Sequence, residues 1–366
     1  MWDAFGRAPT GERLERMRRS PRYSDGHFHN TYPVPTGLDP GVKSPLVELA
    51  TGRQKRSPPA PLPSVDPRPA WASTASSGLR ATWLGHSTTL LEIDGFRVLT
   101  DPVWGKRCSP FKHLGPARFQ PVPVPLEGLP PLDLVAISHD HYDHLDHPTM
   151  QALAHSQVPI VAPLGVGAHL EAWGIAPSRI HELDWGEEFT VRGPGPDGLT
   201  VTSTPAQHFS GRTLRGRLTT LWTSYVLAGP RHRVFFSGDT GLTDEFEGVG
   251  RRLGPFDLTM LEVGAHHPSW GHIHLGPDNA LRAFRMLGGG ALLPIHWGTF
   301  NLALHAWDDP PEQLLRRQAD LGGRLVMPRL GQPTEPSLAG DVAPWWREVA
   351  ASRGAPARRA SMASQA

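Results

Sequence analysis

Short apolar runs with partial alternation dominate the chain from about residue 79 onward. The run at 81–93 is followed by an Asp94-Gly95 pair and a second run at 96–101, which predicts a β-hairpin. Further strands are predicted at 132–139, 158–163, 199–205, 221–228, 232–239, 256–263 and 291–296. Helical periodicity predicts helices at 148–155, 165–173, 277–287 and 310–320. Two groups of strands with interspersed helices predict a layered α/β domain.

The two ends of the chain differ in composition from this region. Residues 1–78 are rich in Pro, Arg and Ser, and we interpret them as an extended arm with a short helix near 10–19. Residues 79–335 are predicted to form the domain, and 336–366 a C-terminal extension. Its tail, from about 351, is small and basic, and we expect it to be disordered.

Composition and charge narrow the classes of function. The 366 residues are 39% hydrophobic, enough for a sizeable core, and the net charge of +1 gives no global attraction to nucleic acid. The single cysteine, Cys108, excludes an internal disulfide framework and a multi-cysteine zinc site, and we interpret it as structural. The N-terminus lacks the apolar run of a secretory signal, and no window approaches the roughly 18 apolar residues of a membrane span. We therefore expect a cytoplasmic protein, with peripheral contact to a membrane left open.

The nineteen histidines fall partly in tight clusters, and the densest is Ser-His-Asp-His-Tyr-Asp-His at 138–144. It follows the apolar run LDLVAIS. Because side chains alternate along extended backbone, His139 and His141 should point the same way and grip one metal. A turn at Tyr142 would bring Asp143 and His144 toward a second metal. Imidazole nitrogen suits zinc, and a carboxylate adds negative charge, so the spacing predicts a metal site.

Three further polar residues end apolar strands elsewhere in the chain. His208 ends LTVTSTPAQH, Asp239 ends VFFSGD, and His296 ends ALLPIH. A single histidine at a strand end is as often an ordinary surface residue. Three such positions in company with the cluster at 138–144 indicate further ligands of the same site.

The chain carries His-x-His-x-Asp-His, followed by a later His, then Gly-Asp and a last His. This order is similar to the pattern of the metallo-β-lactamase superfamily. More closely, the chain resembles N-acylphosphatidylethanolamine-hydrolysing phospholipase D and its bacterial relatives. The matching stretches over roughly 80–330 include LTDPVW (99–104), TPAQHFSGRT (204–213), FFSGDTG (235–241) and IHWGTF (295–300). The resemblance implies an αβ/βα four-layer sandwich preceded by the Pro-rich arm. SDGHFHN (24–30) resembles the arm of this family, which implies packing on the domain or a dimer contact.

The resemblance also implies a ligand set for two zinc ions, with manganese or iron as alternatives. One metal would be held by His139, His141 and His208. The other would be held by Asp143, which we also count among the catalytic residues, with His144 and His296. Asp239 would bridge both metals. A hydroxide between the metals would then serve as nucleophile. Since every ligand lies between 139 and 296, we expect the tail and the arm to be dispensable for metal binding.

Other histidines have less specific signals. His274 and His305 match positions that this subfamily uses near the substrate, so either could donate to a phosphate oxygen or protonate the leaving group. The alternative for each is a surface or helix-entry histidine. His86 matches a family position near the site, whereas His266 and His267 depart from the family pattern, and we assign them no role.

The function predicted from these residues is hydrolysis of a phosphodiester, with a phospholipid or another small phosphodiester as partner, no nucleic acid, and a homodimer left open. An apolar entrance is expected from Trp297, Phe300, Leu302, Leu304 and Trp307. Arg212, Arg215 and Arg217 could meet anionic headgroups, although a solvated loop is the favoured interpretation. The alternative function is a lactonase acting on a phosphorylated sugar lactone, resembling the L-ascorbate-6-phosphate lactonases, which would need a small basic pocket. A non-catalytic scaffold is disfavoured by the intact ligand set, and a nuclease by the lack of a basic stripe.

Overall fold

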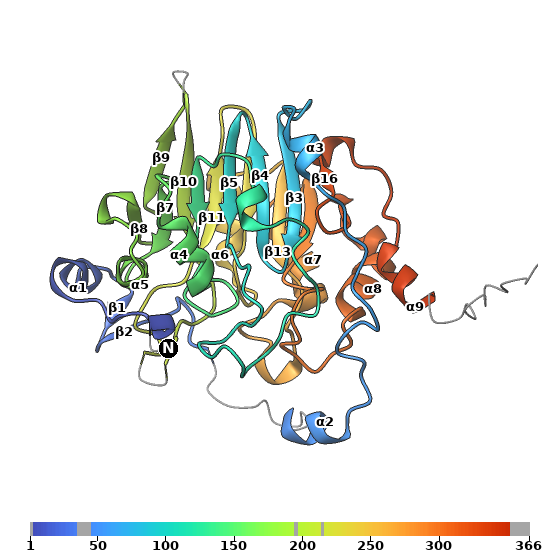
Figure 1. Cartoon of the computed structure of the whole chain (residues 1–366), viewed down its shortest axis with the longest axis horizontal. Helices are drawn as coiled ribbons and strands as arrows, with labels where there is room; N and C mark the ends of the chain where they lie inside the picture. The colour runs from blue at the N-terminus through green and yellow to red at the C-terminus, as the bar shows by residue number, and fades with distance from the viewer. Residues whose placement is uncertain (1–2, 35–44, 194–196, 214–215, 352–366) are drawn as a thin grey trace, which may run out of the picture.

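Two mixed sheets of seven strands each form the centre of the protein (Figure 1). The computed structural model describes residues 3–34, 45–193, 197–213 and 216–351. The first sheet has the order β16 (Pro333–Thr334), β3 (Leu79–Gly85), β4 (Thr88–Ile93), β5 (Phe96–Thr100), β6 (Leu134–Ala136), β7 (Ile160–Pro163) and β8 (Ile180–Leu183). The second has the order β15 (Arg324–Leu325), β14 (Ala291–Ile295), β13 (Leu258–Glu262), β12 (Arg233–Phe236), β11 (Ser224–Ala228), β10 (Gly198–Thr204) and β9 (Glu188–Arg192).

Helices cover the outer faces of both sheets. Helices α4 (His147–Leu153) and α5 (Gly167–Ala172) pack on the first sheet, and α6 (Glu245–Leu253), α7 (Gly276–Met286) and α8 (Asp309–Arg316) pack on the second. Alternate strand residues face different layers: Leu91 and Val98 lie in the core between the sheets, whereas Leu90 and Leu99 pack with Met150 of α4. Because both faces of each sheet are covered, the strands read as near-continuous apolar runs. The predicted four-layer sandwich is confirmed.

The predicted strands at 132–139, 158–163, 199–205, 221–228, 232–239, 256–263 and 291–296 are all present; β10 is shifted by one residue, and the others have shorter bounds. The hairpin between β4 and β5 is also confirmed, with Asp94 and Gly95 both at positive φ (50° and 92°). The run at 81–93, however, is two strands, because the chain turns at Gly85–Ser87 with His86 at φ 52°. Strands β8 and β9 were not predicted. Strand β9 lies at a sheet edge with alternate residues exposed, so its sequence lacks an apolar run.

The N-terminal segment is less extended than predicted. Residues 3–34 contain α1 (Gly11–Arg18), close to the predicted helix, and a hairpin of β1 (Tyr23–Ser24) and β2 (His27–Phe28). Two short helices follow, α2 (Pro45–Thr51) and α3 (Arg68–Trp71). Phe28 is fully buried in a small core with Met17 and Trp222, so this part of the arm packs firmly on the domain.

The C-terminal extension also packs on the domain as far as the structure describes it. Trp345 and Trp346 are buried against Trp297, and α9 (Glu348–Ala351) follows them. The tail for which we expected disorder lies, from 352 onward, outside the described residues. Among the described residues, no helix has both the length and the apolar character needed to cross a membrane.

Candidate metal centre

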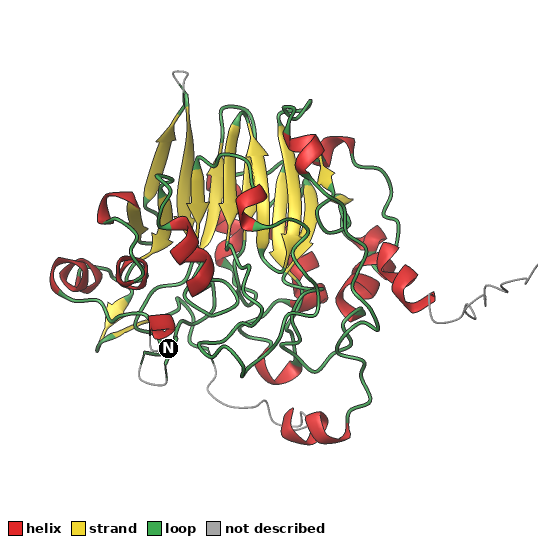
Figure 2. Cartoon of the chain, viewed as in Figure 1, coloured by secondary structure: helices red, strands yellow, loops and turns green. Residues whose placement is uncertain are grey.

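Long loops gather at one end of the strands (Figure 2). The candidate ligands lie in segments that follow the ends of strands. The loop after β6 carries the cluster at 138–144, and the ends of β10, β12 and β14 lead to His208, Asp239 and His296. Gly238 has a positive φ of 55°, and a Cβ there would lie 2.5 Å from the Cβ of Ser138. Only glycine therefore allows the two loops from opposite sheets to approach this closely.

The first cluster consists of His139, His141, His208 and Asp239. The Nδ1 atom of His141 lies 2.9 Å from Nε2 of His139 and 3.3 Å from Nε2 of His208. The Oδ2 atom of Asp239 lies 4.0 Å from Nε2 of His139 and 3.8 Å from Nε2 of His208. The ligand atoms of all four residues lie within 4.8 Å of one another, as predicted for His139 and His141 from strand alternation.

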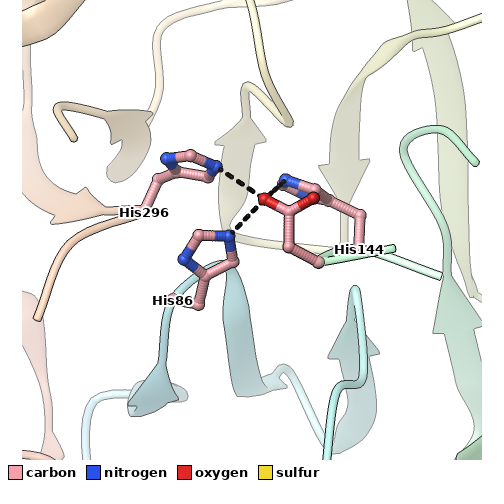
Figure 3. Close-up of side chains that lie close together, drawn as sticks. His86, His144 and His296 are labelled. Atoms are coloured by element: carbon pink, nitrogen blue, oxygen red, sulfur yellow. Dashed lines mark hydrogen bonds and ion pairs between the residues drawn. The ribbon is translucent and has the colours of Figure 1, made fainter. Parts of the chain in front are cut away.

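The second cluster consists of His86, Asp143, His144 and His296 (Figure 3). The Oδ2 atom of Asp143 lies 2.9 Å from Nε2 of His86, and 3.4 Å from Nε2 of both His144 and His296. A turn at Tyr142, marked by a bond from the His144 N–H to the His141 carbonyl, brings Asp143 into this position. The predicted turn is therefore present.

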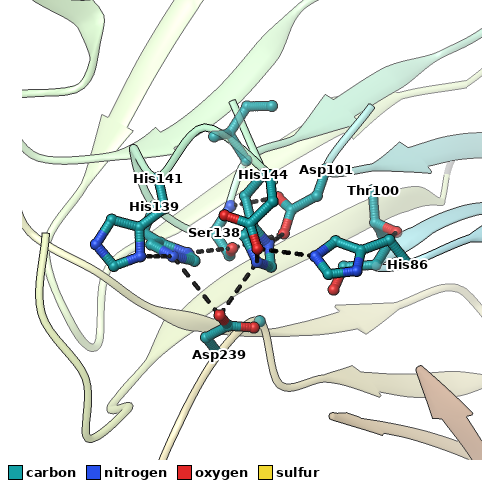
Figure 4. A network of polar contacts seen from close by, with 12 residues as sticks. His86, Thr100, Asp101, Ser138, His139, His141, His144 and Asp239 are labelled. Carbon is teal, nitrogen blue, oxygen red and sulfur yellow. Dashed lines mark hydrogen bonds and ion pairs between the residues drawn. The ribbon is translucent and has the colours of Figure 1, made fainter. Parts of the chain in front are cut away.

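Asp239, a member of the first cluster, also lies beside the histidines of the second (Figure 4). Its Oδ1 atom is 3.1 Å from Nε2 of His296, and its Oδ2 atom is 3.2 Å from Nε2 of His144. The same Oδ2 atom is also the one that faces the first cluster. One carboxylate thus faces ligand atoms of both clusters.

Hydrogen bonds turn the Nε2 atoms of two histidines toward the centre. The Nδ1 atom of His208 lies 2.9 Å from the Ile273 carbonyl, to which it donates. The Nδ1 atom of His144 lies 2.7 Å from Oδ2 of the buried Asp101. A histidine that donates from one ring nitrogen keeps its other nitrogen available as a ligand. Burial lowers the pKa of His208 well below the usual histidine value, so this ring is neutral at neutral pH.

The unsatisfied atoms of the centre fit a metal ion. Within the described part of the chain, Nε2 of His144, Nε2 of His296 and Oδ1 of Asp239 are buried and make no hydrogen bond. The Nε2 atom of His144 lies 3.2 Å from Oδ2 of Asp239, and the Nε2 atom of His296 lies 3.1 Å from Oδ1 of Asp239. Buried polar atoms are otherwise almost always paired. The donor set of imidazoles and carboxylates converging on shared points is the chemistry of a metal site.

A family model described as a β-lactamase superfamily domain matches residues 96–297, more than half of the chain. The chain belongs to the metallo-β-lactamase superfamily. It is 47% identical over 335 residues to an uncharacterized protein of Mycobacterium tuberculosis, covering 90% of this chain and 88% of that one. It is 37% identical over 257 residues to N-acyl-phosphatidylethanolamine-hydrolyzing phospholipase D 1 of Caenorhabditis elegans, covering 67% and 71%.

Among solved structures, the fold is similar to that of a metallo hydrolase from Ignicoccus hospitalis. The TM-score is 0.54 at 23% identity, with 70% of this chain and 97% of that chain covered. The homologues and fold neighbours include metal-dependent hydrolases, and this member of the superfamily is a metal-dependent hydrolase as well.

The metallo-β-lactamase centre includes residues that sequence reasoning missed or left open. His86, which we left open, lies in the second cluster with its ring 3.9 Å from that of His296. Two buried carboxylates were missed: Asp101 supports His144, and Glu262 accepts from His274 Nδ1 at 3.2 Å. Asp101 and Glu262 follow or end apolar strands, which is the signal that identified Asp239.

The two proposed helper histidines lie in different surroundings. The ring of His274 lies 5.1 Å from that of His208, and its ligand atom lies near those of Asp239 and His296. His305 belongs to no cluster of ligand atoms among the described residues; its ring stacks on that of His266 at 4.4 Å. The structure thus brings His274 to the centre and leaves His305 beside it.

His305 shares a narrow cavity with His296, and this cavity replaces the predicted apolar entrance. Its volume is about 20 Å³, little more than one water molecule. Trp297, Phe300 and Trp307 are buried around it, so they form core and no entrance. The expectation of an apolar entrance was wrong for these three residues, whereas the other two predicted residues, Leu302 and Leu304, are half-buried. Aromatic residues in such numbers pack against one another, and their spacing alone could not separate core from channel.

The arginines after His208 also have separate environments. Arg212 is buried, donates to the Asp140 and Leu145 carbonyls, and its guanidinium carbon lies 4.0 Å from the centre of the Tyr142 ring. It holds the ligand loop and is inaccessible to a headgroup. Arg215 lies outside the described residues. Arg217 is exposed, as the solvated-loop interpretation predicted.

The cavity that reaches the centre is formed elsewhere. A volume of about 550 Å³ is bordered by His208, by arm residues 28–31 and by the apolar side chains of Phe209, Trp270 and Ile273. A larger cavity, of about 1170 Å³, touches Tyr142 but none of the seven predicted metal ligands. The smaller cavity is therefore the better route to the candidate ligands.

The reactivity of Cys108 tests whether its thiol takes part in the function, without changing any candidate ligand. Its thiol is buried with Val103 and Phe300, and burial raises its pKa far above the usual thiol value. We expect native protein to resist alkylation at neutral pH and denatured protein to react fully, as measured by mass spectrometry. Cys108→Ala should keep metal content and turnover. Rapid alkylation of native protein that also stops turnover would give the thiol a functional role.

Proposed function

We propose that this superfamily member is a dinuclear metal-dependent phosphodiesterase of the N-acylphosphatidylethanolamine phospholipase D type. The observation that carries the proposal is the position of Asp239. Its Oδ2 atom lies 3.2 Å from Nε2 of His144 in the second cluster and 3.8 Å from Nε2 of His208 in the first. A carboxylate shared between two groups of histidines is the arrangement expected for a pair of metals held close together.

The membership of the two clusters supports the ligand set that the family pattern implies, with His86 as an additional member of the second. His139, His141 and His208 would hold one metal; Asp143, His144 and His296 would hold the other; and Asp239 would contact both. Zinc suits this donor set, and manganese or iron are alternatives. When bound, two metals supply Lewis acidity and charge neutralisation at a phosphoryl group.

The residues around the clusters would assist this reaction. His274 borders the ligands and is held by Glu262, so it is placed to donate a proton or a hydrogen bond to a phosphate oxygen. Asp101 keeps His144 in the orientation in which Nε2 faces the metals. A serine or cysteine nucleophile is unnecessary for such a site, which agrees with the buried position of Cys108.

The cavity beside His208 supports an amphiphilic substrate. It is large enough for an acyl or alkyl segment, and its wall combines Phe209, Trp270 and Ile273 with the guanidinium of Arg217. A relative named for hydrolysis of N-acyl-phosphatidylethanolamine shares 37% identity with the chain. The lactonase alternative requires a small basic pocket, and the size of the cavity beside His208, with Phe209, Trp270 and Ile273 in its mixed wall, favours the phosphodiester.

The test is an activity panel on protein reconstituted with zinc, and in parallel with manganese. The substrates are bis(p-nitrophenyl) phosphate, an N-acylated phosphatidylethanolamine in mixed micelles, and a phosphorylated sugar lactone. We expect two metal equivalents by elemental analysis and turnover of both phosphodiesters. Turnover of the lactone alone would favour the alternative, and a reproducible metal content near zero would overturn the dinuclear site.

Protein variants assayed on the same substrates test the cavity beside His208. Trp270→Ala should raise KM for the lipid and leave the small chromogenic ester unaffected, because only the lipid extends into the cavity. Phe111→Ala is the matched control, since Phe111 lines the larger cavity away from the ligands. The reverse pattern would move the lipid-binding region to the larger cavity.

A further inference from the structure

Asn30, in the N-terminal arm, makes two hydrogen bonds to the backbone of the ligand His208. Its Nδ2 amide donates to the His208 carbonyl at 2.8 Å, and its Oδ1 accepts from the His208 N–H at 3.1 Å. The same Oδ1 accepts from the indole Nε1 of Trp222 at 3.0 Å. All three hydrogen bonds require the same orientation of this amide, with Nδ2 toward the His208 carbonyl and Oδ1 toward the two N–H groups. The contact joins residues 178 positions apart in the chain.

His208 depends on this contact because it lies outside the sheet. Strand β10 ends at Thr204, so His208 stands in a loop without a ladder partner. In the described part of the chain, Asn30 is the hydrogen-bond partner of both its backbone groups. His208 is 1% exposed, so water cannot replace the lost partner at no cost. The amide of Asn30 therefore takes the place of a neighbouring strand.

The hairpin that carries Asn30 is anchored independently of the metals. Asp25 and Gly26 have positive φ values of 51° and 81° and turn the chain between β1 and β2. Phe28 is completely buried against Trp222, and its N–H donates to the Leu218 carbonyl at 2.8 Å. The core around Phe28 fixes the hairpin on the domain, and the hairpin in turn brings Asn30 to His208.

The ring and the backbone of His208 are held by different groups. The carbonyl of Ile273 sets the ring by accepting from Nδ1 at 2.9 Å, and Asn30 sets the position of the backbone from which the ring extends. Residues that support a ligand in this way typically change metal affinity or activity by roughly 10–100-fold when they are replaced. Of the two clusters, only the first contains His208.

We infer that Asn30 is a positioning residue for one of the two metals, so that the N-terminal arm is part of the metal centre. The inference rests on the proposed dinuclear function. It revises our expectation that the whole arm is dispensable for metal binding. It also predicts an asymmetry, because Asn30 acts through His208 and reaches the second cluster only through the shared Asp239.

The experiment compares Asn30→Asp and Asn30→Ala with wild type in the full-length chain, using zinc alone as the probe. Asn30→Asp keeps the size and the acceptor of the side chain but places an oxygen against the His208 carbonyl. Asn279→Ala is the matched control, because Asn279 lies in α7 and its side chain contacts Arg282 away from both clusters. The readout is the rate and affinity with which a chelator removes each of the two zinc equivalents.

We expect one zinc equivalent to bind roughly 10–100-fold more weakly in both Asn30 variants, with the other equivalent close to wild type. The control should match wild type. Equal weakening of both equivalents would indicate general loss of structure and overturn the inference, as would wild-type affinity in both variants. Wild-type protein that binds fewer than two equivalents would instead count against the proposed dinuclear function.

Discussion

Replacing Asp239 with asparagine is expected to remove metal and activity together. The Asp239 carboxylate faces Nε2 atoms of both clusters and is 3% exposed, so no other group in the described structure can take its place. An amide of the same size carries no charge, and two cations close together need a negative ligand between them. The loss of turnover should exceed the roughly 10–100-fold that follows removal of a supporting residue.

The measurement is elemental analysis and phosphodiesterase turnover on the same preparation of Asp239→Asn. Asp244→Asn, five positions further along at the start of α6, provides the control, because Asp244 is exposed and lies outside both clusters. Far-ultraviolet circular dichroism checks that both variants fold. An Asp239→Asn variant with full metal content and full turnover would remove Asp239 from the centre.

The positions of the strand-end candidates were predictable from sequence because of the layered fold. Apolar runs that are buried on both faces form neighbouring strands, and polar residues at their carboxyl ends meet at one edge of a sheet. This reasoning brought His208, Asp239 and His296 together with the loop at 138–144, and the structure has them together. Their roles as metal ligands remain predictions of the proposed function.

Residues that support the candidate ligands were harder to predict. Asp101 and Glu262 lie at the ends of apolar strands just as Asp239 does, but their sequence neighbours do not show which histidine each one meets. His86 was left open because its turn lies inside an apolar run that we interpreted as a single strand. Asn30 was not identified, since nothing in the local sequence relates it to a loop 178 residues away.

Some side chains could not be assigned to the core or to the surface from sequence, and their burial in the structure decides these cases. Arg212 and Arg217 are five positions apart in the same loop, yet one is buried beneath the ligand loop and the other is exposed. Trp297 and Trp307 were predicted to line an entrance and instead form part of the core. Spacing shows which side chains share a segment, whereas only the packing of the layers shows which of them face solvent.

His274→Ala is expected to retain both metals and to lose activity. The Nδ1 atom of His274 lies 3.2 Å from Glu262, which is completely buried, while the side chain of His274 itself is 12% exposed. The carboxylate therefore accepts a hydrogen bond from Nδ1 and holds the orientation of the ring. The Nε2 atom can then act as an acid beside the ligand clusters when it also carries a proton, and general acid catalysis of this kind contributes roughly 10²–10⁴-fold.

Metal content distinguishes a helper from a ligand in this variant. The ligand atoms of His274, Asp239 and His296 lie within 4.8 Å of one another, so geometry alone allows His274 to contact a metal. Loss of one metal equivalent in His274→Ala would make it a ligand. Retention of both with a large loss of turnover would make it a helper in the reaction.

The leaving group separates acid catalysis from substrate positioning. A nitrophenolate departs with little protonation, whereas an alkoxide leaving from a phospholipid needs a proton. A general acid therefore accelerates hydrolysis of the lipid more than hydrolysis of the nitrophenyl ester. We therefore expect His274→Ala to lose much more activity on N-acylated phosphatidylethanolamine than on the nitrophenyl ester. His305→Ala is the comparison variant, and its loss should be smaller, because the His305 ring stacks on His266 outside the ligand clusters. Equal losses on both substrates would assign His274 to positioning of the phosphate, and wild-type turnover would leave it without a role in the reaction.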